Sequence, residues 1–243
     1  MNKLLKYGRA EHIPYYNCSS KSDEEWQKVG SSMAIFGSIL LSWGVVVEVL
    51  YIPVLAIIFK LKLLKHSCFK IIIMLGLIDM EAVAVNSITS GIFFIKGTVY
   101  CCYPTFIYIF GAIGETSWFF GSVTTILLVT NRVTDVVCHN FSEFLFKRNR
   151  VFIPMLICFC YGQYIFWYSP PVLFNSNVMA WITDPLVIED NDEYIAYEIF
   201  FQCSIICFFN TAAATSYSII LYFARPPWFV ITADIFWSIN HGA

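Results

Sequence analysis

Four acidic side chains interrupt otherwise apolar stretches of this chain, and they are the first candidates for chemistry: Glu48, Asp79, Glu81 and Glu115. A carboxyl group in such surroundings either binds a cation or stays protonated and hydrogen-bonded, because burial disfavours its charged form. An ionisable residue at the centre of a membrane span costs about 3 kcal/mol, so each is a candidate intramembrane polar switch.

Asp79 is the strongest of these candidates. It lies nine residues past Lys70, which is roughly 13 Å along a helix, so its carboxyl group must face a bundle interior. Glu81 points roughly 200° away around the same helix, so the two acids need different partners. For Glu48 and Glu115, a hydrogen bond to a neighbouring helix is the simpler alternative.

Two further positions have a functional and a plainer interpretation. Trp118 lies about one helical turn from Glu115; it either lines a small-molecule cavity or packs against other side chains. The pair Asn131-Arg132 ends an apolar stretch. Arg132 is either an interfacial arginine that reaches toward headgroups or a switch at the cytoplasmic end of the third helix. Asp135 could pair with it if the helix continues.

The elements that must position these residues are membrane helices. The chain has 243 residues, of which 58% are hydrophobic and 13% are charged; soluble domains carry about 25% charged residues. The apolar residues are gathered in long continuous runs. A helix needs roughly 20 apolar residues to cross a bilayer, and it satisfies its backbone N–H and C=O groups with its own hydrogen bonds, so these runs predict membrane helices. We therefore expect an all-α, transmembrane helix bundle with five full spans and a C-terminal partial span: 33–59, 71–95, 103–130, 151–174, 199–224 and 227–243.

The charges between the spans predict their orientation. Residues 60–70 hold four lysines and no acid, and residues 132–150 are also basic, whereas residues 174–198 hold six acids and no Lys or Arg. The positive-inside rule places the first and third connectors in the cytoplasm. Residues 1–32 would then form an extracellular N-terminal tail, and the first span would serve as its own insertion signal.

Sites outside the membrane follow from this orientation. The sequon at Asn17 would face the lumen and is a candidate glycosylation site, whereas the sequon at Asn140 would face the cytoplasm. The cysteines expected outside are Cys18, Cys101 and Cys102. A disulfide could therefore join Cys18 to either Cys101 or Cys102, and the sequence does not decide between the two pairings.

Other function classes find no support. The sequence contains no catalytic signature, no cluster of metal ligands and no cofactor motif. The net charge of −2 gives no reason to expect a nucleic-acid partner. We expect neither an enzyme nor a metal or cofactor protein.

The chain resembles the nematode serpentine receptors of class T. The motifs that carry the resemblance are spread over most of the chain: Leu5-Lys6-Tyr7-Gly8, Tyr16-Asn17-Cys18-Ser19-Ser20, Trp26, Leu50-Tyr51-Ile52-Pro53, Ser67-Cys68-Phe69-Lys70-Ile71, Leu75-Gly76-Leu77-Ile78-Asp79, Asn86-Ser87-Ile88, Tyr100-Cys101, Tyr103-Pro104, Asn131-Arg132, Trp228-Phe229, Trp237 and His241-Gly242.

The resemblance implies a seven-helix chemoreceptor that is similar to G-protein-coupled receptors. It implies a location in the plasma membrane of chemosensory neurons, an environmental small molecule as ligand and a heterotrimeric G protein as cytoplasmic partner.

The chain departs from that family pattern at its fifth helix. Residues 198–224 resemble the sixth helix, yet they follow the acidic outer connector directly. By this resemblance the chain lacks the fifth helix, the third cytoplasmic loop and the end of the seventh helix, and a chain without that loop is poorly suited to G-protein coupling. We expect a truncated, splice-variant or gene-model form of such a receptor.

Two other functions remain open. The four intramembrane acids could line the path of a small-solute or ion transporter or channel. Alternatively, the chain is a receptor fragment without function. A ligand-evoked G-protein response would separate a receptor from both.

Overall fold

The computed structural model describes residues 1–183, apart from the side chains of residues 136, 137 and 139. The spans expected at 199–224 and 227–243, and the junction near residue 198, lie outside the described residues. The elements in chain order are α1 Asn2–Tyr7, η1 Ala10–His12, η2 Pro14–Tyr16, α2 Asp23–Val29, α3 Ala34–Lys60, η3 Leu63–Lys65, α4 Ser67–Val83, η4 Ala84–Thr89, α5 Ser90–Lys96, η5 Tyr100–Cys102, α6 Pro104–Val137, α7 His139–Phe146, α8 Phe152–Tyr168, β1 Leu173–Asn175 and β2 Ala180–Ile182.

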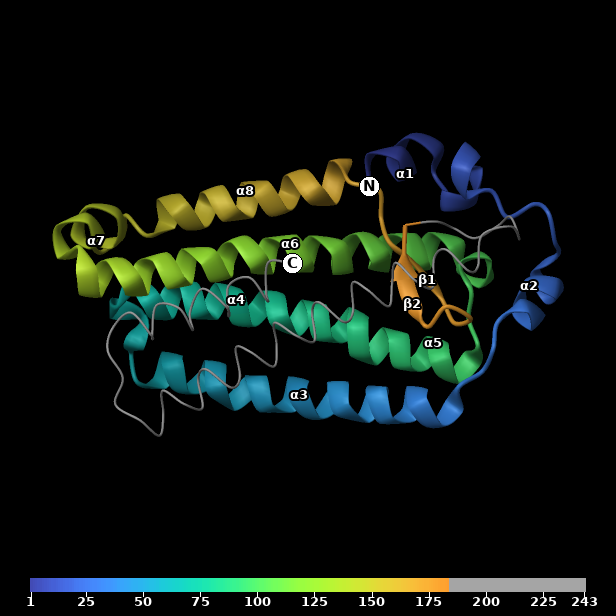
Figure 1. The fold of residues 1–243 in the computed structure, drawn as a ribbon, viewed down its shortest axis with the longest axis horizontal. Coiled ribbons are helices and arrows are strands. Elements are labelled where there is room, and N and C mark those ends of the chain that lie inside the picture. The colour runs from blue at the N-terminus through green and yellow to red at the C-terminus, as the bar shows by residue number, and fades with distance from the viewer. Residues whose placement is uncertain (184–243) are drawn as a thin grey trace.

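The long helices lie side by side and form a bundle (Figure 1). Helix α3 packs on α4 and α5, and α6 packs on α4 and α8. Glycines permit the close approach of α3 to its neighbour: a Cβ on Gly37 would lie 2.5 Å from the carbonyl oxygen of Gly91. Small residues at helix crossings are typical of membrane bundles, where helices associate through close packing.

The second predicted span, 71–95, is one helical stretch with a widened turn. Helices α4 and α5 are joined without a break by η4, a π-helical segment. The hydroxyl of Thr89 donates to the carbonyl oxygen of Ala84 at 2.9 Å, and that of Ser90 donates to Val85 at 3.1 Å. These side chains satisfy carbonyl groups in the segment where the ordinary helical ladder is interrupted.

Two helix boundaries differ from the predicted spans. Helix α6 continues past the expected limit at 130 to Val137, so Asn131 and Arg132 lie inside the helix. Helix α8 ends at Tyr168, before the expected limit at 174. The residues after it explain this difference, because Pro170 and Pro171 lack the backbone N–H that a continuing helix needs.

The expectation of a purely helical fold misses one short hairpin. Strands β1 and β2 pair antiparallel, with Leu173 opposite Ile182 and Asn175 opposite Ala180. The backbone N–H of Ser176 donates to the carbonyl oxygen of Thr98 at 3.1 Å. The hairpin therefore lies against the connection between α5 and α6, at the end of the bundle that carries α1 and α2 (Figure 1).

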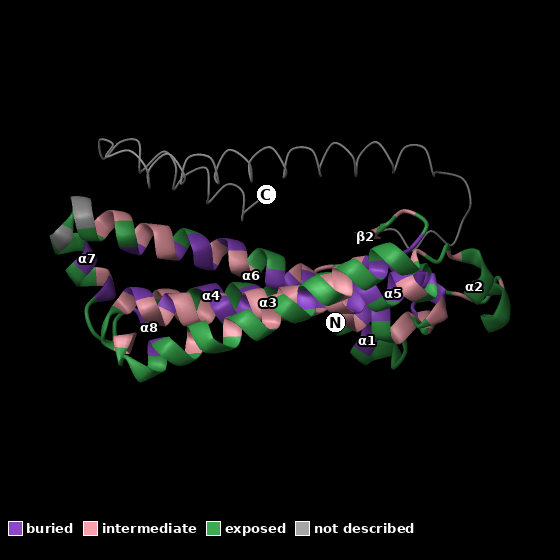
Figure 2. Ribbon diagram, turned by 90° about the horizontal axis from the view of Figure 1, so that it is seen from below, coloured by how far each residue is buried: buried purple, intermediate pink, exposed green. Residues whose placement is uncertain are grey.

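Residues 1–32 form a packed cap rather than a loose tail. Leu4, Ile13, Tyr16 and Trp26 are buried in the same core cluster as Phe174 of the hairpin. The sequence shows no apolar run here because these residues are spaced irregularly along short helical turns. Figure 2 shows buried residues gathered at this end of the molecule, whereas exposed residues dominate the flanks of the long helices.

The flanks of the bundle are apolar. On α3, Ile35 is 81% exposed and Trp43 is 64% exposed, and on α8, Ile153 is 63% exposed. Soluble proteins rarely expose such continuous apolar surface. Two described helices, Ala34–Lys60 and Pro104–Asp135, have the length and apolar composition of a membrane span, and α8 is apolar but shorter.

Candidate functional site

The intramembrane acids make contacts with three different elements. The hydroxyl of Tyr51 on α3 donates to Asp79 Oδ2 at 3.0 Å. The hydroxyl of Ser117 on α6 donates to Glu81 Oε2 at 3.2 Å. Asp79 and Glu81 therefore face different neighbouring helices, as their angular separation on α4 requires.

The other two acids differ in how well their polar atoms are satisfied. The hydroxyl of Ser169, just after α8, donates to Glu115 Oε1 at 2.6 Å. Within the described part of the chain, Glu48 Oε1 is buried and has no hydrogen-bond partner. Tyr51 lies three residues after Glu48 on α3, about one helical turn away, and donates to Asp79, so the three residues form one polar group between α3 and α4. The structure does not gather all four acids around one path.

Sequence reasoning missed the partners of these acids. Tyr51, Ser117 and Ser169 are neutral residues in apolar surroundings, where no charge marks them. Tyr51 donates to Asp79 and Ser117 donates to Glu81, each across to another helix. Spacing along one helix therefore gives no signal for these partners.

A cavity of about 310 Å³ opens at the capped end of the bundle, between the N-terminal cap and the end of α8. Aromatic side chains dominate its wall: Tyr16, Tyr108, Trp167 and Tyr168. Ser169, which also lines it, connects the cavity to Glu115. Besides these rings, the lining includes Met1 with its charged N-terminus, Asn2 and Lys3, so the cavity offers aromatic faces together with several polar groups. Small-molecule sites commonly combine aromatic surface with a few placed polar groups.

Trp118 does not contribute to this cavity. It lies on α6 and is 39% exposed, and it lines none of the three cavities found among the described residues. Its role in binding a ligand stays a prediction.

The cap above this cavity is tied to the bundle. A disulfide joins Cys18 to Cys101 at the start of the helical bundle, and Cys102 keeps its thiol. The indole N–H of Trp26 donates to the carbonyl oxygen of Cys18 at 3.0 Å. Burial raises the pKa of Cys102, so this thiol stays protonated at neutral pH.

Asn177 fixes the hairpin to the cap, and Asn17 lies on the cap surface. The amide oxygen of Asn177 accepts hydrogen bonds from the backbone N–H and the hydroxyl of Ser31, both at 2.9 Å. Asn17 is exposed, and its amide oxygen accepts a hydrogen bond from the backbone N–H of Ser19 at 2.9 Å. Its glycosylation stays a prediction.

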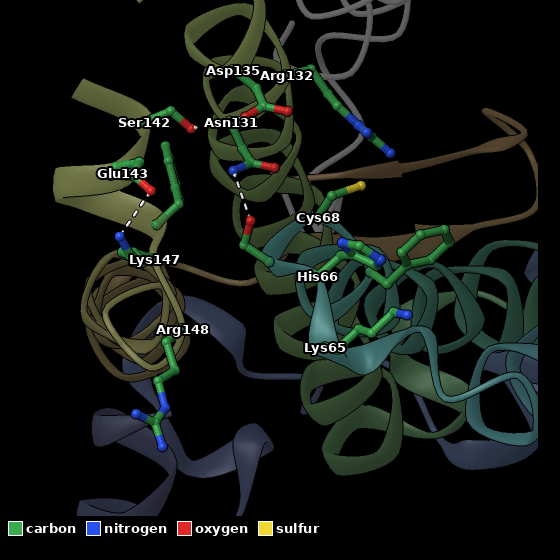
Figure 3. A pocket seen from close by; sticks show the side chains of 13 residues that line it. Lys65, His66, Cys68, Asn131, Arg132, Asp135, Ser142, Glu143, Lys147 and Arg148 are labelled. Carbon is green, nitrogen blue, oxygen red and sulfur yellow. Dashed lines mark hydrogen bonds and ion pairs between the residues drawn. The ribbon is translucent and has the colours of Figure 1, made fainter. Parts of the chain in front are cut away.

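The opposite end of the bundle holds a second cavity, of about 460 Å³, around Asn131 and Arg132 (Figure 3). Asn131 is buried, and its amide donates to Ser67 Oγ at 3.2 Å, which links α6 to the start of α4. Asp135 lines the same cavity and accepts a hydrogen bond from Ser142 at 3.4 Å. In Figure 3 the Arg132 side chain extends away from the Asp135 carboxylate.

Comparison with known proteins shows which family the chain resembles. The family model described as serpentine type 7TM GPCR chemoreceptor Srt matches residues 3–198 and, in a second segment, residues 194–243. Serpentine receptor class T-55 of Caenorhabditis elegans is 28% identical over 184 residues, which are 73% of this chain and 49% of that protein. The chain therefore spans about half the length of this curated relative. No solved structure matches it.

Proposed function

The chain belongs to the serpentine class T family of seven-transmembrane chemoreceptors, and from that premise we propose that it is a G-protein-coupled-receptor-like chemosensory receptor for an environmental small molecule. Its family is membrane-embedded and is not a family of enzymes. The observation that carries the proposal is the pair of cavities at opposite ends of one helix, α6. One end suits a ligand, and the other presents Asn131 and Arg132.

The charge distribution supports an orientation with the N-terminus outside. The connector between α3 and α4, which is rich in lysine, lies at the same end of the bundle as the connector between α7 and α8 (Figure 1). The second connector holds Lys147, Arg148 and Arg150. The disulfide lies at the other end, where an oxidising compartment would preserve it. The aromatic cavity would then face the outside and the Arg132 cavity the cytoplasm.

The ligand would enter the aromatic cavity beneath the cap. Tyr16 and Tyr108 offer ring faces, and their ring centroids are 5.3 Å apart. Glu115 lies behind Ser169 and would respond to a polar group that competes for the Ser169 hydroxyl. A small molecule with an apolar or aromatic part and more than one hydrogen-bonding group fits this composition.

A change at the ligand end could reach Arg132 through α6. Glu115, Ser117 and Asn131 all lie on this helix: Glu115 contacts Ser169 just after α8, whereas Ser117 and Asn131 contact the two ends of α4. A shift of α6 would alter these contacts together. Coupling of this kind needs an element with two arrangements that both ends can bias.

The family pattern is interrupted between the fourth predicted span and residues 198–224, and the proposal includes an explanation of this interruption. The two matched segments meet at residues 194–198, which is where the resemblance places a missing fifth helix. We propose that this chain is a variant form of the receptor that lacks this helix. A fragment without function remains the alternative to a signalling variant.

A transporter or channel is less well supported. The hydroxyl groups of Tyr51, Ser117 and Ser169 engage Asp79, Glu81 and Glu115 separately. An ion path would need these polar atoms to face a shared route through the bundle.

We expect cells that express the full chain with a G-protein dissociation reporter to respond to members of a panel of small alcohols, ketones and esters. Arg132→Gln should reduce the maximal response about tenfold, because a charge-assisted contact to a partner is worth roughly 1.5–3 kcal/mol. Arg150→Gln removes a nearby charge outside the cavity and should leave the response unchanged. Ligand-evoked current or uptake without G-protein dissociation would favour the transporter, and silence to the whole panel would favour the fragment.

A further inference from the structure

Cationic side chains outnumber acidic ones in the lining of the cavity around Arg132. Lys65, Arg132, Lys147 and Arg148 line it together with His66, whereas Asp135 and Glu143 are its two acids. Four cations against two acids leave a formal charge of +2, with histidine neutral. The cavity therefore attracts anions.

The acids of the cavity are already engaged by other groups. Glu143 forms an ion pair with Lys147 at 2.9 Å along α7. Asp135 accepts the hydrogen bond from Ser142. Among residues 1–183, by contrast, neither Lys65 nor Arg132 forms an ion pair. These two cations therefore carry most of the attraction for an anion from solution or from the membrane.

The cations that remain project to the same side. Figure 3 shows Arg132, His66 and Lys65 extending to one side of the cavity, with Cys68 between them, whereas Arg148 points away. Arg132 comes from α6, while Lys65 and His66 immediately precede α4. Cations that come from two elements thus lie on one side of the cavity.

The first turn of α4 adds partial positive charge to the same space. Ser67, Cys68 and Phe69 line the cavity, and the side chain of His66 makes no capping hydrogen bond at the helix start. The helix has 17 residues, and its first N–H groups lack partners within the helix. Such a terminus favours phosphate oxygens.

The walls of the cavity are held in place. Asn131 donates to Ser67, and the ammonium group of Lys70 donates to the carbonyl oxygen of Arg148 at 2.8 Å. These bonds join α4, α6 and the connector between α7 and α8. The backbone segments that carry Lys65 and Arg132 are therefore held relative to each other before any anion binds, which reduces the entropic cost of binding.

Exposed apolar surface lies next to the cavity. Lys70 lies 4.9 Å from the centroid of the Phe152 ring, and its neighbour Phe69 lines the cavity. Phe152 is 52% exposed, and Ile153 is 63% exposed. A lipid whose headgroup entered the cavity could lay its acyl chains against this surface.

We propose that this cavity binds the phosphorylated headgroup of an inositol phospholipid from the cytoplasmic leaflet. Lys65, Arg132 and the first turn of α4 would hold its phosphate groups. Basic pockets between membrane helices on the cytoplasmic side suit such headgroups. The inference rests on the orientation in the proposed function, and it gives Arg132 a ligand other than the G protein.

The test uses the full chain in phosphatidylcholine nanodiscs without G protein. The probes are dioctanoyl phosphatidylinositol 4,5-bisphosphate, the free headgroup inositol 1,4,5-trisphosphate, and dioctanoyl phosphatidylserine. We expect the inositol lipid to bind most tightly. The double variant Lys65→Gln/Arg132→Gln should weaken its binding about tenfold or more, since each lost charge-assisted contact removes a substantial part of the affinity.

Lys60→Gln/Lys62→Gln is the matched control. It removes two lysines of the same connector that do not line the cavity, and it should change the dissociation constant less than about threefold. Arg132→Lys provides a milder variant that keeps the charge and loses the planar fork, and it should weaken binding about threefold even if the double variant fails to fold.

Each outcome decides the proposal. Equal losses in the cavity and control variants, or equal binding of phosphatidylserine, would overturn it in favour of diffuse attraction between charges. Equal binding of inositol trisphosphate would retain the phosphate site and assign it to a soluble anion. This binding test contains no G protein, so its result does not depend on signalling. If the lipid binds here but the reporter cells give no G-protein response, the proposed function fails and this inference stands.

Discussion

Cys18→Ser is expected to lower the free energy of unfolding by about 2–5 kcal/mol and to reduce the amount of protein at the cell surface. The disulfide links positions 83 residues apart, and it fastens the cap to the segment that begins α6. Without it, the cap keeps only its buried side chains and a few hydrogen bonds, such as that from Tyr100 to the carbonyl oxygen of Tyr16. Thermal unfolding in detergent and antibody labelling of intact cells measure the two effects.

Cys102→Ser is the matched control for this prediction. Cys102 follows Cys101 directly, but its thiol only donates to the carbonyl oxygen of Trp26 at 3.6 Å, and serine can also donate there. The control should unfold within about 1 kcal/mol of the unaltered chain. Equal destabilisation by both substitutions would show that the disulfide is not what holds the cap.

Gly111→Ala should destabilise the bundle by about 3 kcal/mol or more. A Cβ at this position of α6 would overlap the carbonyl oxygen of Val172 and lie 2.8 Å from its carbonyl carbon. Val172 cannot move easily, because it lies between Pro171 and strand β1. Overpacking against backbone forces displacement of the hairpin from the helix, at the upper end of the usual cost. Unfolding followed by tryptophan fluorescence in detergent measures the loss.

Gly121→Ala offers a control on the same helix with the opposite expectation. Its new Cβ would meet Ile78 Cγ2 at 3.5 Å, which is an ordinary contact. Alanine is also the better helix former by as much as about 1 kcal/mol. Gly121→Ala should therefore be neutral or stabilising, and a similar loss in both variants would contradict the close approach of α6 to Val172.

The long helices were predictable because their signal is continuous. The apolar run at 33–59 has the length of a membrane span, and α3 occupies nearly the same residues, Ala34–Lys60. The boundaries of the other helices were harder to predict from the sequence. Hydropathy averages over many residues, so it could not separate the end of α8 at Tyr168 from the apolar strand β1 that follows the two prolines.

The cap was missed for a related reason. Leu4, Ile13, Tyr16 and Trp26 are buried, but they are separated by polar residues and belong to short turns. No helical or strand period connects them. Their burial depends on the hairpin and on the disulfide to Cys101, which are distant in the sequence.

The candidate site was predictable only at its charged members. Asp79, Glu81 and Glu115 stand out because they interrupt apolar sequence, and each has a hydrogen-bond donor from another element. The donors Tyr51, Ser117 and Ser169 are ordinary in apolar helices, so no pattern marks them. Lys65 and His66 were visible only as part of a basic connector, since their convergence with Arg132 depends on how α4 packs on α6.

The central claim is that the chain spans the membrane with its disulfide-tethered cap outside and the Arg132 cavity inside. Cysteines introduced by Lys28→Cys in α2 and by Asn149→Cys before α8 report the two faces to a membrane-impermeant maleimide. Both are placed in a background that carries Cys102→Ser, Cys138→Ser and Cys160→Ser, which removes the free thiols that are not buried among the described residues. Both positions are exposed. Labelling of intact cells should modify the cysteine at position 28 at once, and the cysteine at position 149 only after permeabilisation. Modification of position 149 in intact cells, with position 28 protected, would contradict the account.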